Sequence, residues 1–180
     1  MLRCLLGAEL QRAPGSLQFE AGPHGKPRLA GADSGSSLEF NLSHSGDLAL
    51  LGCAWGRELG VDIEQWREMR DEAALVQRYF SAAEQAAYTA LPAARRTRGF
   101  FQCWTRKEAY VKAVGRGLGL PLDSFDVSLD DGDGARLLRC SPLGGKELPW
   151  SLSAPDVGSF ASAAVVLASE RCALLPADET

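Results

Sequence analysis

The segment 98–114 constrains the fold most, because its pattern predicts a long helix with charged residues beside its apolar face. Residues of one helical face recur at about 100° per residue. The apolar residues of this face are Phe100, Trp104, Val111 and Val114. Glycines at 115, 117 and 119 predict the end of the helix. Lys107 and Glu108 lie on or beside the apolar face, where an unpaired charge is costly. The rest of the chain must therefore cover this helix and provide partners for its charges.

The predicted elements follow the order helix, strands, helices, strands. Leucines at helical spacing predict a helix over about 1–12. Short alternating or apolar runs predict strands that end near 42 and cover 49–55, 59–63, 124–129, 135–140, 150–153 and 160–168. Residues 56–58 are interpreted as a hairpin connection, and Ser81 with Glu84 forms a capping box for a helix that ends by Pro92. This order predicts an α+β fold of two similar lobes, each a helix on a small, mainly antiparallel sheet.

Composition excludes several classes of protein. The chain has 180 residues, 46% of them hydrophobic, which is enough for one domain or two closely packed halves. A net charge of -4 argues against a nucleic-acid binder with a broad basic face. No apolar run approaches the roughly 20 residues of a membrane span. The five scattered cysteines show no metal-binding spacing, so we expect reduced thiols and a cytoplasmic protein.

Two carboxylates in the stretch 60–64 are expected on one face of a strand. Side chains alternate along a strand, so Asp62 and Glu64 point the same way while Val61 and Ile63 point to the core. Neighbouring carboxylates repel each other unless a cation lies between them, and oxygen ligands suit magnesium. The alternative is a strand whose acidic face simply meets solvent.

The long helix adds a third carboxylate and a lysine. Lys112 follows Glu108 by one helical turn, so the two could form an ordinary i,i+4 pair with no further role. His44 lies between two serines in what we interpret as a tight connection between strands. Three carboxylates, two lysines and a histidine together indicate a magnesium–phosphate site. The pattern by itself does not identify the phosphate compound.

Four ordered motifs resemble those of one enzyme family. GVDIE at residues 60–64 is followed after about 40 residues by WTRKEAYVKAVGRGL, and HGKPRL and FNLSHS precede both. Together they resemble the 4'-phosphopantetheinyl transferases, in particular the subgroup that activates peptide, polyketide and fatty-acid synthases. The resemblance implies two pseudo-symmetric lobes, 1–70 and 71–180, with the site at their interface. It implies transfer of the 4'-phosphopantetheine arm of coenzyme A to a serine of an acyl or peptidyl carrier protein, with magnesium and with release of 3',5'-ADP.

The resemblance also assigns roles to the acidic and basic residues. Asp62, Glu64 and Glu108 match the metal ligands of the family, and Glu108 also matches its general base for the carrier serine. Lys112 matches the lysine that contacts the phosphates and assists the leaving group. Lys107 is expected beside it as electrostatic support and as a contact to coenzyme A.

Further contacts to coenzyme A follow from the same resemblance. They would come from Arg3, Gly25, Lys26, Pro27, Arg28, Ser43 and His44. The serine and the histidine match phosphate contacts, and the glycine–proline turn matches the loop that holds adenine. Arg3 matches an arginine that binds the 3'-phosphate; the alternative, of equal weight, is that it is only a solvated residue of the first helix. Members of this subgroup usually begin with several dozen further residues, so we expect the N-terminal lobe to lack a segment.

Basic residues outside the site suggest a surface for an acidic carrier protein. They are Arg67 and Arg70, after the GVDIE strand, and Arg95, Arg96 and Arg98, in a predicted loop between helices. The alternative is a solvated basic loop. For the whole chain, the alternatives are a metal-dependent nuclease and a coenzyme A-binding module without catalysis. The resemblance favours a monomer over a trimer.

Overall fold

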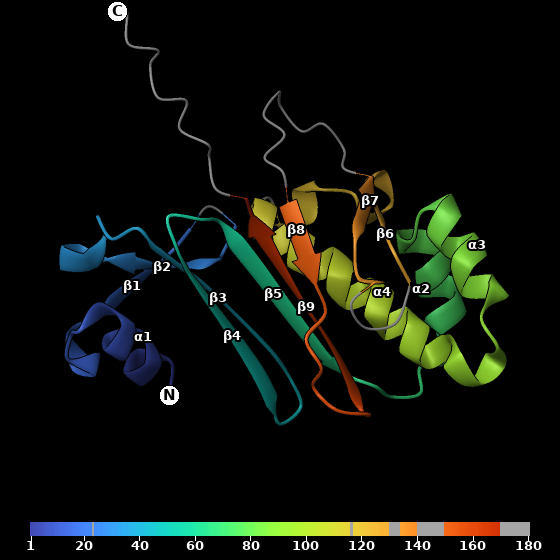
Figure 1. Cartoon of the computed structure of the whole chain (residues 1–180), viewed down its shortest axis with the longest axis horizontal. Helices are drawn as coiled ribbons and strands as arrows, with labels where there is room; N and C mark the ends of the chain where they lie inside the picture. The colour runs from blue at the N-terminus through green and yellow to red at the C-terminus, as the bar shows by residue number, and fades with distance from the viewer. Residues whose placement is uncertain (23, 116, 130–133, 140–149, 170–180) are drawn as a thin grey trace, which may run out of the picture.

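The computed structural model describes residues 1–22, 24–115, 117–129, 134–139 and 150–169. Helices and small antiparallel sheets alternate along it, which confirms the predicted α+β class (Figure 1). The predicted strand 135–140 is observed as β7 (Leu137–Arg139), and its last residue lies outside the described ranges. None of the helices in these ranges is long and apolar enough to cross a bilayer.

A three-stranded antiparallel sheet and one long helix form the centre of the molecule. The sheet has the order β5 (Leu59–Gln65), β9 (Ala161–Ala168), β8 (Trp150–Ser153), and α4 (Ala93–Val114) packs along it. A methyl group on Gly60 of β5 would lie 2.1 Å from the carbonyl oxygen of Ala109. Because no side chain separates helix and strand at this point, the acidic residues of β5 lie close to those of α4.

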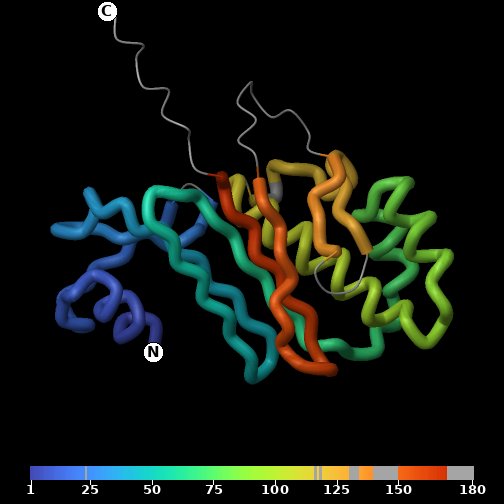
Figure 2. Tube along the Cα trace, viewed as in Figure 1, coloured from blue at the N-terminus to red at the C-terminus, as the bar shows by residue number. Residues whose placement is uncertain are grey.

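A hairpin of β3 (Leu38–Ser45) and β4 (Leu48–Trp55) lies beside this sheet (Figure 2). The predicted hairpin between β4 and β5 was wrong, because β5 forms its ladder with β9. Side chains join β3 to β5 instead: the Asn41 amide oxygen accepts from the Val61 backbone, 2.8 Å away. His44 lies within β3, one residue before the turn, rather than in the connection.

The N-terminal elements have a small core of their own. They are α1 (Leu2–Leu10) and a two-stranded sheet of β1 (Gln18–Ala21) and β2 (Pro27–Ala30), followed by β3. The buried side chains of this core are Leu6, Leu17, Leu29, Leu38 and Phe40. Short 3-10 turns at Pro14–Ser16 and Gly31–Asp33 connect these elements.

The remaining elements pack around α4 in the larger core. Before it come α2 (Glu72–Tyr79) and α3 (Ala82–Ala90), and after it 3-10 turns at Gly117–Gly119 and Leu122–Ser124 and the strand pair β6 (Asp126–Val127) and β7. The capping box of Ser81 and Glu84 is confirmed at the start of α3. Most of α4 is buried because the sheet covers one side and these elements cover the other.

The order helix, short strand pair, longer strand pair occurs twice, in α1–β1–β2–β3–β4 and in α4–β6–β7–β8–β9. Such a repeat is what two pseudo-symmetric lobes would require. The strand β5 belongs to the first lobe by the predicted boundary at 70, but it pairs with β9 of the second. The two halves therefore share a sheet, and the residues of β5 lie where the halves meet.

Candidate active site

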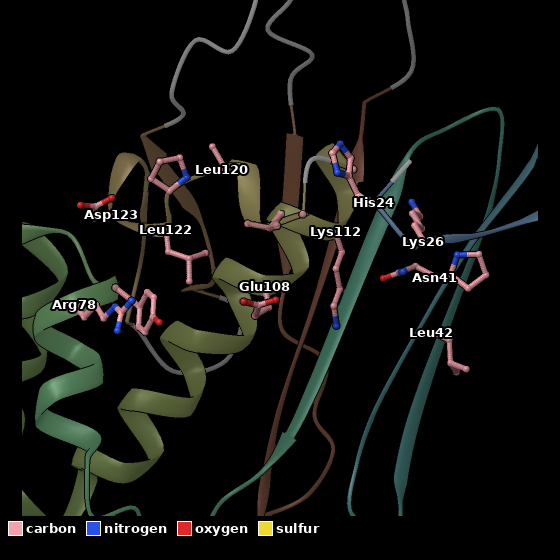
Figure 3. Close-up of a pocket in the computed structure, with 17 residues that line it drawn as sticks. His24, Lys26, Asn41, Leu42, Arg78, Glu108, Lys112, Leu120, Leu122 and Asp123 are labelled. Carbon is pink, nitrogen blue, oxygen red and sulfur yellow. The ribbon is translucent and has the colours of Figure 1, made fainter. Parts of the chain in front are cut away.

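Two adjoining hollows meet at α4 and contain most of the predicted site residues. The first has a volume of about 570 Å³, and the second of about 410 Å³. They share Leu42, Glu108 and Lys112. Figure 3 shows the last two side chains extending from α4 between the two sides of the first hollow. We call the first the large cavity and the second the acidic hollow.

The large cavity lies between the two halves of the chain. One side is formed by His24, Gly25, Lys26 and Pro27 with Asn41 and Leu42 of β3, and the other by Arg78 and Tyr79 of α2 and residues 120–123. Gly25 has a φ of 80°, a conformation that glycine adopts without strain. The Lys26 ammonium donates to the Leu59 carbonyl, 2.8 Å away, and burial lowers its pKa. This cavity therefore combines apolar walls with a small number of polar groups, as ligand sites do.

Asp62 is the most enclosed group of the acidic hollow. It is 4% exposed, and its Oδ1 accepts from the Ser43 hydroxyl at 2.7 Å and from the Lys112 ammonium at 2.6 Å. Its Oδ2 is buried and has no hydrogen-bond partner among the residues that the structure describes. Burial raises the pKa of Asp62, although Lys112 and Ser43 act in the opposite direction. A buried acceptor without a partner is costly, so this oxygen is suited to a ligand.

Glu64 lies two residues after Asp62 on β5 and faces the same hollow. Its Oε2 accepts from the Ser45 hydroxyl at 2.6 Å and pairs with Arg67 at 3.1 Å. Within the described ranges no group of three His, Cys, Asp or Glu side chains is arranged to hold a metal ion. The three predicted ligands thus line one hollow, but Asp62 and Glu64 already bond to hydroxyl and basic side chains.

Glu108 is half-buried between the two hollows. In the part of the chain that the structure describes, its carboxylate has no hydrogen-bond or ion-pair partner. Burial raises the pKa of Glu108, the Asp62 carboxylate raises it further, and the Lys112 ammonium opposes the rise. Glu108 and Lys112 do not form the simple i,i+4 pair that was the alternative, because Lys112 of α4 pairs with Asp62 of β5. A carboxylate of this kind can accept a proton more readily than an exposed one.

Ser43 and His44, the predicted phosphate contacts, both line the acidic hollow. Ser43 is buried and receives a hydrogen bond from Lys112 at 3.0 Å, while it donates to Asp62. His44 is exposed and lines the acidic hollow beside Glu64. The Ser43 hydroxyl is therefore built into the site, while the exposed His44 follows it on the strand.

Three predicted coenzyme A contacts lie outside both hollows. Lys107 is fully buried, and its ammonium pairs with Glu84 at 2.7 Å and donates to two backbone carbonyls, so the expectation of a coenzyme A contact from it was wrong. Arg28 is exposed on β2 and lines neither hollow. Arg3 donates to the carbonyls of Pro14 and Leu17, and its guanidinium lies 5.0 Å from the centre of the Phe19 ring.

Three of the five arginines proposed for carrier docking are placed differently from the prediction. Arg95, Arg96 and Arg98 lie in the first turns of α4 and not in a loop, although all three are exposed. Arg98 lies 5.5 Å from the centre of the Trp66 ring, and Arg67 lies 5.3 Å from that of Phe101. Arg70 is exposed after β5. Three of these arginines thus belong to α4, and Arg67 and Arg98 each lie near an aromatic ring.

Sequence reasoning missed the far wall of the large cavity. Arg78 and Tyr79 had no motif that marked them, because they are ordinary residues of an amphipathic helix. The segment 120–123 carried a signal, since PLDSF follows the glycines, but this signal alone did not place it at the site. Asn41 was visible in FNLSHS, and its side chain lies on the cavity side of β3.

Comparisons with known proteins agree with this geometry. A family model described as the 4'-phosphopantetheinyl transferase superfamily matches residues 58–165. The chain is 36% identical over 167 residues to the 4'-phosphopantetheinyl transferase HetI of a Nostoc strain, covering 92% of this chain and 67% of the relative. It is 32% identical over 130 residues to the transferase Sfp of Bacillus subtilis, covering 72% of this chain and 55% of the relative. It therefore spans between half and two thirds of these relatives.

One solved structure is similar in both fold and sequence. It is a holo-(acyl-carrier-protein) synthase from Bacillus anthracis in complex with CoA, with a TM-score of 0.51 and 27% sequence identity. The match covers 63% of this chain and 96% of that one. Almost the whole of the smaller synthase thus corresponds to a part of this chain.

Proposed function

This chain belongs to the 4'-phosphopantetheinyl transferase superfamily, and on that premise we propose that it moves the 4'-phosphopantetheine arm of coenzyme A to a serine of an acyl or peptidyl carrier protein. One observation carries the proposal: Glu108 and Lys112 stand where the large cavity meets the acidic hollow. A ligand in the cavity would have its phosphates within reach of a carboxylate that can take a proton and a lysine that can neutralise charge.

The large cavity supports coenzyme A as the donor. Two of its basic groups, Lys26 and Lys112, lie on the side formed by the N-terminal half and α4, and a third, Arg78, lies on the opposite wall, so a pyrophosphate in the cavity could be neutralised. The turn at Gly25 and Pro27 exposes backbone at the cavity edge, which suits close contact with a flat base. The apolar wall at residues 120–122 suits the less polar part of the ligand.

Magnesium is the ion that fits the acidic hollow. Asp62, Glu64 and Glu108 offer only carboxylate oxygens there, which is the donor set that magnesium prefers. Asp62 Oδ2 has no other partner within the described ranges. Binding would require Lys112 to leave Asp62, and the 29% exposure of the lysine side chain leaves it room to do so. When bound, the ion would neutralise charge on the phosphate oxygens of the donor.

The residues of the chain account for the proton and the leaving group. The carrier serine oxygen attacks the phosphorus that bears the pantetheine arm, and its proton passes to the Glu108 carboxylate. The bond from this phosphorus to the bridging oxygen breaks, and 3',5'-ADP leaves with the electron pair. Lys112, once free of Asp62, offsets the charge that develops on the departing phosphate. The raised pKa of Glu108 supports its role as the base.

The carrier would approach from the side of the exposed arginines. Carrier proteins of this class are acidic by the resemblance, and charges at the rim of an interface mainly increase the rate of association. Replacing Arg95, Arg96 and Arg98 together by glutamate is expected to raise the KM for carrier while the KM for coenzyme A stays unchanged. Unchanged carrier kinetics would mean that these residues are only a solvated part of α4.

Intact-mass analysis tests the transfer itself. An apo carrier protein incubated with this chain, coenzyme A and magnesium should gain the mass of one phosphopantetheine arm. Glu108→Gln should slow the gain by about 100-fold or more, as expected for the loss of a general base. Glu20→Gln, the same change at an exposed position of β1, is the matched control and should not. Coenzyme A binding without any mass gain on several carriers would point to a binding module.

A further inference from the structure

Lys107 neighbours Glu108 in sequence, but its side chain is fully buried, whereas Glu108 is half-buried at the site. Its ammonium lies 2.7 Å from Glu84 Oε2, 2.6 Å from the Leu122 carbonyl and 2.8 Å from the Phe125 carbonyl. These three contacts use all three donors of a lysine. It also lies 4.3 Å from the centre of the Phe125 ring. No donor is left for a ligand, so the role of Lys107 must be sought in what it holds.

Glu84, the partner of Lys107, ties three elements together. It is 2% exposed, and its Oε2 accepts from the Ser81 backbone at 2.8 Å as part of the capping box. Its Oε1 accepts from the Val127 backbone at 2.8 Å. The pair therefore joins the start of α3, the middle of α4 and the strand β6. The backbone of segment 122–127 is held at Leu122, Phe125 and Val127 by this one pair.

The segment that the pair holds begins as a wall of the large cavity. Residues 120–123 form one side, and Glu108, Val111 and Lys112 of α4 lie beside it in the same cavity (Figure 3). The Leu122 carbonyl is the point where this wall is joined to α4 through Lys107. The length of the lysine side chain thus sets the spacing between the wall and the helix that carries the acidic and basic site residues.

We propose that Lys107 is a positioning residue for coenzyme A, which acts by fixing the 120–125 wall of the large cavity against α4 through its buried pair with Glu84. The proposal rests on the proposed function, because it takes coenzyme A as the occupant of the cavity. A buried ion pair often adds little net stability compared with well-packed apolar residues of the same volume. The geometry of the wall is therefore the property that the pair is expected to control.

Two variants separate positioning from stability. Lys107→Met removes the three contacts and leaves the Glu84 carboxylate buried without its cation, so the melting temperature should fall. In Lys107→Met/Glu84→Gln no unpaired buried charge remains, so part of the loss in melting temperature should be recovered. Neither variant can hold the Leu122 and Phe125 carbonyls. Both should bind coenzyme A about tenfold more weakly, because part of the binding energy would then be spent on ordering the wall.

Val166→Ala is the matched control for instability alone. Val166 is fully buried in the core beside α4 and lines neither hollow, so the variant should lose melting temperature and keep its affinity for coenzyme A. Affinity is measured by calorimetry with coenzyme A and magnesium. In the transfer assay, the KM for coenzyme A should rise in both Lys107 variants, while kcat at saturating coenzyme A should change by about twofold or less, because Glu108 stays in place.

The outcomes distinguish the inference from the proposed function. Wild-type affinity in the double variant would overturn the positioning role, whether or not the single variant folds. An affinity loss in Val166→Ala that matches its fall in melting temperature would do the same, because instability alone would then explain the effect. If the wild-type protein itself does not bind coenzyme A, the proposed function fails instead.

Discussion

Replacing Asp62 by asparagine is expected to stabilise the metal-free protein while it abolishes transfer. Asp62 is 4% exposed, one of its carboxylate oxygens has no partner in the part of the chain that the structure describes, and burial is the main reason that its pKa is raised. A raised pKa means that the folded state disfavours the charged form at neutral pH. Asparagine keeps the shape and one acceptor for Ser43 and Lys112 without that charge.

The magnitude follows from two opposing terms. An unsatisfied buried acceptor costs about 1–3 kcal/mol and more when charged, and the neutral amide avoids the charged part. Loss of the pair with Lys112 costs about 1 kcal/mol or less, because this lysine is 29% exposed and can turn to water instead of remaining as a buried charge. The expected net rise in the free energy of unfolding is about 1 kcal/mol.

Urea unfolding, followed by tryptophan fluorescence in the presence of a chelator, measures this difference. The advantage of Asp62→Asn should be complete at neutral pH and should shrink as the pH falls through the raised pKa of Asp62, because the wild-type group then becomes neutral too. Asp126→Asn is the matched control: hydrogen bonds from Arg139 lower the pKa of Asp126, so this variant should be less stable than wild type at neutral pH. A clear loss of stability in Asp62→Asn would refute the reasoning.

Two further predictions concern packing and the metal. Gly60→Ala would place its methyl group 2.1 Å from the Ala109 carbonyl oxygen, so β5 and α4 must separate. We expect the free energy of unfolding in urea to fall by about 2–3 kcal/mol, and an unchanged unfolding midpoint would contradict the close packing. Magnesium affinity, measured by calorimetry with coenzyme A present, should begin to fall at a pH above the usual carboxylate range, because burial raises the pKa of Asp62 and Glu108 and their protons compete with the ion. An affinity that stays constant down to about pH 4 would exclude these two residues as ligands.

The sequence predicted the parts of the fold that rest on local patterns. The capping box at Ser81 and Glu84, the strands 49–55 and 150–153 and the end of the long helix were visible because side-chain chemistry or periodicity marks them directly. The strands β1 and β2 were missed, because they have four residues each and expose most of them. The start of α4 was placed five residues too late, since its first turns carry arginines and alanines and no apolar stripe.

Pairing between distant elements could not be predicted from local patterns. The short connection at 56–58 favoured a hairpin, but β5 pairs with β9, about 100 residues later in the chain. For the site, spacing along the strand placed Asp62 and Glu64 on one face, and both line the same hollow as Glu108. Spacing placed Lys107 on or beside the apolar face of α4, but it could not identify the partners of the lysine, because Glu84 and the two carbonyls belong to other elements. Contacts of this kind exist only once the tertiary structure has formed.

The position of a divalent ion in a crystal structure with coenzyme A tests the central claim most directly. Manganese in place of magnesium would reveal the ion by its anomalous scattering. We predict one ion in the acidic hollow, bound by oxygens of Asp62, Glu64 and Glu108 and by the phosphates of coenzyme A, with Lys112 released from Asp62. An ion bound elsewhere, or coenzyme A in the large cavity with the Asp62–Lys112 pair still intact and no ion beside it, would contradict the account.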